Sequence, residues 1–208
     1  NNIELIKEIK FPNSIGLLYS AITSYLGFRV NNSEFKVMGL AAYGEQNKNK
    51  NIFYDKLKKL ISINNDGSYT LDMSYFTFMY KTSMVSNKMI KLLDEPVRRK
   101  KDPITQKHKN IAAAIQLISE EIIFGLLKEL YALTKCDSLT YSGGLALNSV
   151  INGKIQQKSP FKKLWIQPNA GDGGGSVGAA AYVYNCVQKN KRTYVQNNTY
   201  FGPNFKTK

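Results

Sequence analysis

The sequence predicts an α/β fold in which a mixed sheet is flanked by helices. Two strand–turn–helix units follow one another between Leu139 and Ala181, and each joins a short apolar run to a glycine cluster and then to small residues at helical spacing. The apolar repeat over residues 109–134 is typical of a long core helix. With 208 residues, 43% of them hydrophobic, the chain can bury the core of one domain or of one lobe of a larger enzyme.

The first half of the chain predicts short helices. A strand-like run opens the chain, and an amphipathic helix follows it, with Ser14 at its start and Gly27 at its end. Residues 52–63 and 85–93 have helical spacing as well.

An Asp-Gly turn followed by alternating apolar residues predicts a β-hairpin over residues 64–80. His108 is expected in the loop before the long helix, in a structural or substrate-facing role. Within that helix, Glu120 and Glu121 are expected on a solvated side.

The formal net charge of +14 raises nucleic acid as a partner, but its distribution argues against specific binding. Lysines are scattered, residues 98–101 form the one dense basic cluster, and no nucleic-acid-binding motif is present. No apolar run approaches the roughly 20 residues of a membrane span, and no signal pattern opens the chain, so a cytoplasmic location is expected. Cys136 and Cys186 lack ligand spacing and are expected to be buried in a reducing interior.

The first glycine cluster is a candidate ligand-binding turn. Ser142, Gly143 and Gly144 place no bulky side chain in the way of a flat ring or a phosphate that approaches the main chain. Asn148 lies about one helical turn further on, where its amide can point back to the turn.

The second cluster places one carboxylate among glycines that invite an anion. Gly171 and Gly173 flank Asp172. Two unscreened like charges at about 4 Å repel by roughly 4 kcal/mol at an effective dielectric of 20, so an acid beside a phosphate makes sense chiefly with a cation between them. Asp172 is therefore a candidate metal ligand. The alternative is a helix N-cap that accepts from the amides of Gly174 or Gly175.

Lys36 and Gly39 form a weaker candidate pair, in which a cation precedes a bare backbone position. A solvated lysine on a helix that leads to a glycine cap explains the same residues.

Six segments, in order over nearly the whole chain, carry a family resemblance. They read FPNSIGLLYSAITSYLGF, EFKVMGLAAYG, PITQKHKNIAAAIQ, SGGLALN, WIQPNAGDGGGSVGAA and YFGP. Together they resemble the nodulation protein U type O-carbamoyltransferases, of the superfamily of actin, sugar kinases and the threonylcarbamoyl transferases of tRNA modification. The run from Tyr141 to Ala146 looks like the adenosine motif of that superfamily.

The resemblance implies a two-stage reaction. One domain makes carbamoyl-adenylate from carbamoyl phosphate and ATP, and an actin-like (ribonuclease H-like) domain passes the carbamoyl group to a hydroxyl of a sugar or another small molecule. Asp172 is implied as a ligand of iron, Fe(2+), or another divalent metal. The adenosine contacts are implied to come from Gly143, Gly144 and Asn148, with Lys36 and Gly39 on the opposite wall. Asp172 and Lys36 are the candidate catalytic residues. The further candidate nucleotide-binding residues are Ser142, Gly171 and Gly173.

The same resemblance sets the expected domain organisation. Residues 1–198 are expected to be the second, C-terminal lobe of the actin-like domain, and residues 199–208 the start of a linker to an adenylate-forming domain that is absent. Family members carry a His-x-x-x-His pair with two more metal ligands in an earlier stretch, which is also absent. We therefore expect self-association or a companion chain that supplies the missing lobe. A non-catalytic nucleotide-binding or scaffold subunit is the alternative.

Overall fold

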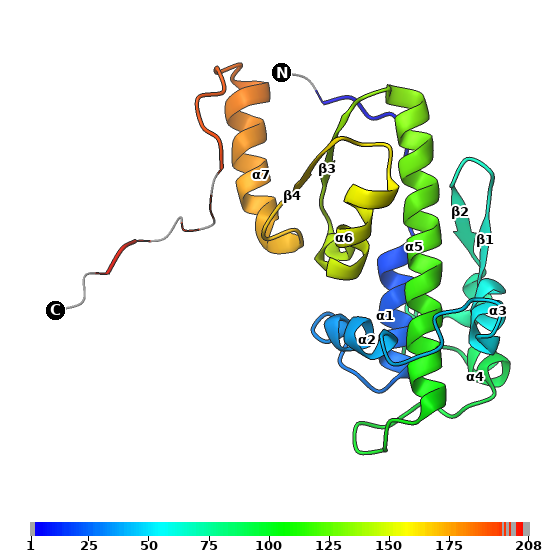
Figure 1. Ribbon diagram of the computed structural model, residues 1–208. Coiled ribbons are helices and arrows are strands. Elements are labelled where there is room, and N and C mark those ends of the chain that lie inside the picture. Colours follow the sequence, from blue (N-terminus) through cyan, green and yellow to red (C-terminus); the bar gives the residue numbers. More distant parts are fainter. Residues whose placement is uncertain (1–2, 197, 199, 201–202, 206–208) are drawn as a thin grey trace.

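A computed structural model describes residues 3–196, 198, 200 and 203–205. Its central element is α5 (Gln106–Thr134), a helix of 29 residues around which the other elements lie (Figure 1). The buried apolar residues of α5 are at most 7% exposed: Ile111, Ala112, Ala113, Ala114, Ile115, Ile118, Ile122, Ile123 and Leu127. This confirms the predicted core helix, which begins at Gln106 rather than at Lys109.

Four short helices surround the first half of α5, and a hairpin lies beside it further along (Figure 1). The helices are α1 (Ile15–Tyr25), α2 (Glu34–Ala41), α3 (Ile52–Lys58) and α4 (Asn87–Leu93), and the hairpin consists of β1 (Ile61–Ile63) and β2 (Tyr69–Leu71). The helix α1 begins as predicted, because the side chain of Ser14 accepts from the amide of Leu17. Gly27 ends that region with φ +73°, where an added Cβ would lie 2.3 Å from the carbonyl oxygen of Arg98.

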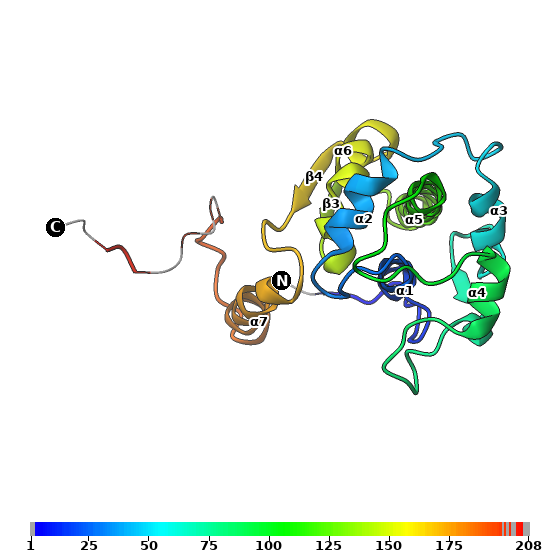
Figure 2. The ribbon, with the colours of Figure 1, turned by 90° about the horizontal axis from the view of Figure 1, so that it is seen from below.

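The two predicted strand–turn–helix units lie on the other side of α5 from the hairpin (Figures 1 and 2). The parallel strands β3 (Ser138–Tyr141) and β4 (Lys163–Ile166) pair with Leu139 opposite Leu164, and α6 (Ser149–Lys158) connects them. After β4 comes α7 (Gly175–Tyr182), which continues into a π-helical turn, Val183–Val187. Both views show α7 standing apart from the core (Figures 1 and 2), and none of its eight residues is buried.

The coarse α/β prediction is confirmed, since small sheets are flanked by helices. The predicted mixed sheet was wrong, because the described strands form two separate pairs, β1–β2 antiparallel and β3–β4 parallel. Several local predictions were wrong. The described residues 3–10 form no strand, and the helix predicted over 52–63 ends at Lys58, because Ile61–Ile63 pair in the hairpin instead. The predicted hairpin is correspondingly short, since Met73–Tyr75 form a 3₁₀ turn.

Tertiary contacts also overturn three predictions of solvent exposure or burial. Glu120 is 9% exposed and pairs with Lys154, so its predicted solvated position was wrong, whereas Glu121 is exposed as expected. The two cysteines, predicted to be buried, are exposed at Cys136 and partly exposed at Cys186.

The basic cluster is divided by burial. Arg98 is 8% exposed, and its guanidinium donates to the carbonyl oxygen of Leu26 over 2.8 Å, whereas the next three cations are exposed. Arg98 therefore holds the loop against α1 and is removed from any basic surface.

Among the described residues, α5 is the helix long and apolar enough to cross a membrane, with a mean hydropathy of 1.5 over its 18-residue window. Since 67% of that window is buried inside the protein, its apolar length is that of a core helix. The expected cytoplasmic location stays a prediction.

His108 lies inside the first turn of α5 and not in the preceding loop. The amide of Thr105 donates to Nδ1 of His108 over 3.0 Å, so the imidazole closes the start of the helix in the manner of a capping box. This is the structural role that the sequence left open. Burial lowers the pKa of His108, and the nearby Arg98 guanidinium lowers it further.

The lowered pKa of His108 predicts a loss of stability on acidification. Because the folded pKa lies below the ordinary value of about 6.5, the neutral ring stabilises the fold at higher pH, and that contribution is lost as pH falls through the folded pKa. We expect the free energy of unfolding to fall between about pH 7.5 and 5.5, measured by urea denaturation. His108→Gln, which keeps a side-chain acceptor at the helix start, should flatten this dependence because the chain has 1 histidine. An equally steep dependence in the variant would contradict it.

The hairpin turn packs directly on the middle of α5. Gly67 has φ +73°, and a Cβ there would lie 2.6 Å from the backbone carbon of Gly125, whereas a Cβ on Gly125 would meet Gly67 at an ordinary 3.4 Å. We expect Gly67→Ala to lower the free energy of unfolding by about 2 kcal/mol or more, through the left-handed backbone and the overlap. The matched Gly125→Ala should be neutral or stabilising by up to about 1 kcal/mol. Chemical denaturation compares the two, and equal losses would refute the packing argument.

Candidate functional site

The two glycine loops meet at the carboxyl ends of the parallel strands β3 and β4. Because β3 and β4 are parallel, both loops leave the carboxyl ends of their strands, the usual place of ligand sites in α/β folds. The amide of Gly143 donates to the carbonyl oxygen of Ala170 over 2.8 Å. This bond joins the first loop to the second and sets the distance between them.

The first loop leaves its backbone open. Gly143 has φ +100° and ψ 168°, a conformation that suits glycine, and a 3₁₀ turn at Gly144–Leu147 follows it. An added Cβ on Gly143 or Gly144 would meet nothing within 4 Å. Ser142 is exposed beside them. The space over this turn is therefore accessible to a flat ligand.

Tyr141, the last residue of β3, precedes this turn. Burial raises the pKa of its phenol to about 12, so the ring stays neutral at physiological pH. Its buried hydroxyl has no hydrogen-bond partner among the residues that the structure describes.

In the second loop, glycines serve two purposes. Gly174 is needed by the fold, because a Cβ there would lie 2.2 Å from the backbone oxygen of Asn169. A Cβ on Gly173 would meet Nδ2 of the exposed Asn169 side chain at 2.2 Å, a group that can move. Gly175 has nothing within 4 Å of an added Cβ, and Gly171 meets only Leu147, at 3.6 Å. The last two positions leave room above the backbone.

The N-terminus of α7 follows the second loop, and no side chain caps it. By contrast, α6 is capped by Asn148, whose Oδ1 accepts from the amide of Ile151 over 3.1 Å. Uncapped amides at a helix start favour a bound anion.

Asp172 opens the short turn Asp172–Gly174 and is exposed. Its carboxylate accepts no hydrogen bond from the described residues, so the alternative N-cap bond to Gly174 or Gly175 is not formed. No group of three or more His, Cys, Asp and Glu side chains able to hold a metal occurs in the described part of the chain. Asp172 thus fits as one ligand of an ion, but these residues do not make a complete metal site.

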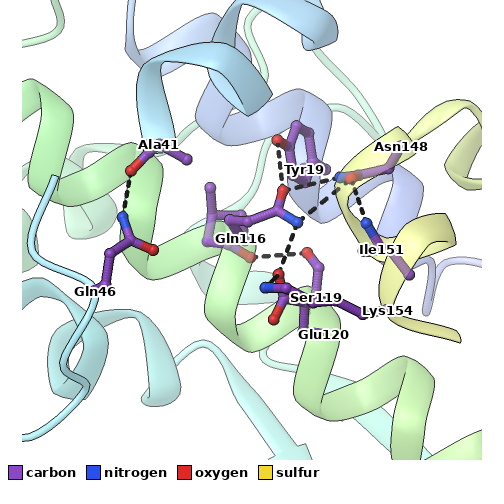
Figure 3. Close-up of polar contacts among 10 residues, drawn as sticks. Tyr19, Ala41, Gln46, Gln116, Ser119, Glu120, Asn148, Ile151 and Lys154 are labelled. Carbon is purple, nitrogen blue, oxygen red and sulfur yellow. Dashed lines mark hydrogen bonds and ion pairs between the residues drawn. The ribbon is translucent and has the colours of Figure 1, made fainter. Parts of the chain in front are cut away.

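Asn148 makes contacts within the protein in addition to the adenosine contact that the resemblance implies. Its side chain is 7% exposed and pairs with Gln116 as well as capping α6 (Figure 3). The contact with adenosine stays a prediction.

Lys36 and Gly39 lie on α2, which reaches the start of α6. There the hydroxyl of Ser149 lies 3.6 Å from Sδ of Met38. Lys36 is exposed, with its ammonium 5.8 Å from the ring centroid of Phe35, and a Cβ on Gly39 would meet nothing within 4 Å. These positions leave both residues free to face a ligand, and their roles stay predictions.

An apolar groove of about 980 Å³ separates α7 from the open face of β3 and β4. Thr140 and Trp165, paired across the strands, line one side, and Val177 and Tyr184 line the other. Exposed apolar surface of this kind is typical of a face that meets other protein. The expected association with a second copy or a companion chain stays a prediction, and most of the predicted linker 199–208 lies outside the described residues.

The sequence reasoning missed a buried polar cluster below the first loop. It includes Tyr19, Gln116 and Glu120, which are at most 9% exposed. The available signal was Gln116 and Glu120 at a spacing of four on the apolar side of a long helix.

Comparison with known proteins identifies the family of this chain. Residues 1–181 match the family model described as carbamoyltransferase N-terminus, so the chain belongs to the carbamoyltransferase family.

Individual relatives agree with the predicted resemblance to nodulation-type proteins. The chain is 40% identical over 202 residues to uncharacterized protein sll1178 of Synechocystis sp., covering 95% of this chain and 32% of that protein. It is 30% identical to nodulation protein NolNO of Sinorhizobium fredii, over 93% of this chain and 26% of the relative. Nodulation protein NolO of Bradyrhizobium diazoefficiens is 32% identical over 84% of this chain and 29% of the relative. The chain thus spans about a third or less of these relatives.

Proposed function

We propose that this chain binds the adenylate part of carbamoyl-adenylate, which is made from carbamoyl phosphate and ATP, and takes part in carbamoyl transfer to a hydroxyl of a sugar or another small molecule. The observation that carries the proposal is that the two glycine loops meet at the carboxyl ends of β3 and β4. The hydrogen bond from the amide of Gly143 to the carbonyl oxygen of Ala170 joins the two loops. Membership of the carbamoyltransferase family supports the reaction class. The chain spans about a third or less of these relatives, so the proposal concerns its part in the reaction.

The two loops suit different parts of the nucleotide. The open backbone at Gly143 and Gly144 suits the flat adenosine, because no Cβ stands over the turn. The start of α7 suits the phosphate because no side chain caps it, with the amide of Gly175 itself donating to the carbonyl oxygen of Asp172. Lys36 on α2 would add a positive charge on the facing side.

Asp172 would supply one ligand of Fe(2+) or another divalent ion, and the remaining ligands would come from outside the described residues. Such an ion, when bound, withdraws charge from the phosphate. The carboxylate itself lies at the start of the turn that leads into α7, so it is close in sequence to the proposed phosphate position.

The same proposal includes the finer fold, the second lobe of an actin-like domain. It is supported by the parallel β3–α6–β4 unit with ligand loops at the carboxyl ends of its strands.

The open space over Gly144 predicts a variant that separates binding from folding. Gly144→Val adds a side chain that meets no protein atom within 4 Å of its Cβ but projects where the adenosine would lie. We expect the affinity for ADP to fall at least about tenfold, or 1.4 kcal/mol, in isothermal titration calorimetry.

The matched control is Gly153→Val on α6, where a Cβ also meets nothing within 4 Å. It should bind ADP as the parent does, and both variants should keep the parent melting temperature. Equal affinity of Gly144→Val and the parent would remove the adenosine from this turn.

The exposed carboxylate of Asp172 predicts a second variant. Asp172→Asn should abolish carbamoyl transfer and lower the affinity for ferrous iron in the presence of ATP. It should change the free energy of unfolding by less than about 0.5 kcal/mol, since the carboxylate bonds to no described residue. Turnover and metal content, with the thermal melt, are the measurements.

Asp55→Asn, an exposed acid on α3, is the control and should leave all three unchanged. Unchanged turnover and metal content in Asp172→Asn would overturn the ligand assignment. Tight ATP binding with an affinity independent of iron would favour the alternative, a non-catalytic nucleotide-binding or scaffold subunit.

A further inference from the structure

A buried polar cluster links the core helix α5 to the first glycine loop (Figure 3). It consists of residues from α1, α5 and α6: Tyr19, Gln116, Glu120, Asn148 and Lys154. Lys154 is partly exposed, and the other four residues are at most 9% exposed.

The centre of this cluster is a reciprocal pair of amides. Nδ2 of Asn148 donates to Oε1 of Gln116 over 2.9 Å, and Nε2 of Gln116 donates to Oδ1 of Asn148 over 3.3 Å. The remaining capacity of Gln116 is used as well: Oε1 accepts from the hydroxyl of Tyr19 over 3.2 Å, and Nε2 donates to Glu120 over 3.1 Å. Both ends of the Gln116 amide are thereby engaged.

This pairing holds Asn148 in one place relative to the core. A buried amide that loses its partner is destabilised, so displacement of Asn148 would leave several polar groups unsatisfied at once. A second link holds α6 to the same helix, because the ammonium of Lys154 lies 2.5 Å from Oε1 of Glu120. The start of α6 is therefore tied to α5 at two neighbouring turns.

Three backbone hydrogen bonds lie between Asn148 and the two glycine loops. The amide of Asn148 donates to Leu145 over 2.9 Å, and the amide of Ala146 donates to Gly143 over 3.0 Å. Gly143 in turn donates to Ala170 in the second loop. The position of Asn148 thus governs the 3₁₀ turn that presents Gly143 and Gly144.

We propose that Gln116 is a positioning residue of the nucleotide site, which sets the Gly143–Gly144 turn through Asn148 and so sets the spacing of the two loops. The inference rests on the proposed function, since it concerns the same site. Gln116 touches no ligand in this arrangement. Its amide selects one geometry of the turn, a role that an apolar side chain of similar size would not perform.

Gln116→Met tests the role directly, because it keeps the length of the side chain and removes the amide. In the ligand-free protein, we expect amide hydrogen exchange at Gly143 and Ile151 to accelerate at least about tenfold. The affinity for ADP should fall by a similar factor. Ser119→Ala is the matched control: Ser119 is 0% exposed on the same helix, but its hydroxyl bonds only to Ile115 one turn earlier. It should leave both readouts as in the parent.

A double variant separates positioning from stability. In Gln116→Met alone, the buried amide of Asn148 loses its partner. Adding Asn148→Ser removes that amide and keeps a side-chain oxygen that can cap α6. We expect its melting temperature to recover toward that of the parent, while fast exchange at Gly143 and weak ADP binding persist. Full recovery of exchange and affinity together with stability would overturn the inference.

The two readouts distinguish this inference from the proposed function. Unchanged exchange at Gly143 in Gln116→Met overturns the inference whether or not the protein binds nucleotide. Accelerated exchange with unchanged ADP affinity also overturns it and leaves the nucleotide site standing. A parent that binds no ADP at all overturns the proposed function, and the exchange measurement still decides whether Gln116 holds the turn.

Discussion

Burial of α5 on several sides is the constraint on which the rest of this structure depends. Five consecutive residues, 111–115, are each 0% exposed, so the helix is covered on more than one face. The helices α1, α2, α3 and α6 all contact it. Any polar group on such a helix must find a partner inside the protein.

That requirement connects the core to the candidate site. Gln116 and Glu120 are the polar groups that α5 carries toward α6, and their partners are Asn148 and Lys154. The same helix that stabilises the fold therefore orients the turn beyond β3. A ligand loop supported in this way rests on a rigid element rather than on its own flexible backbone.

The glycines of the two loops show why composition alone is an incomplete guide to a site. Gly174 stands in a glycine-rich run but is required by the close approach of the Asn169 backbone, whereas Gly173 meets only the end of the exposed Asn169 side chain. Gly143, Gly144 and Gly175 have no such neighbour, and they are the positions where a ligand could reach the backbone. The sequence pattern predicted the cluster correctly, but only the neighbouring atoms distinguish the two kinds of glycine.

The sequence by itself determined the features that depend on nearby residues. The cap at Ser14, the turn at Gly67, the apolar face of α5 and the two strand–turn–helix units all follow from local spacing, because hydrogen bonds and side-chain periodicity within one element create them. Tertiary structure decided what depends on residues far apart in the chain. Burial of Glu120, the pairing of Gln116 with Asn148 and the bond from Gly143 to Ala170 join segments more than 25 residues apart, or place a charge inside the core, so no local pattern contains them.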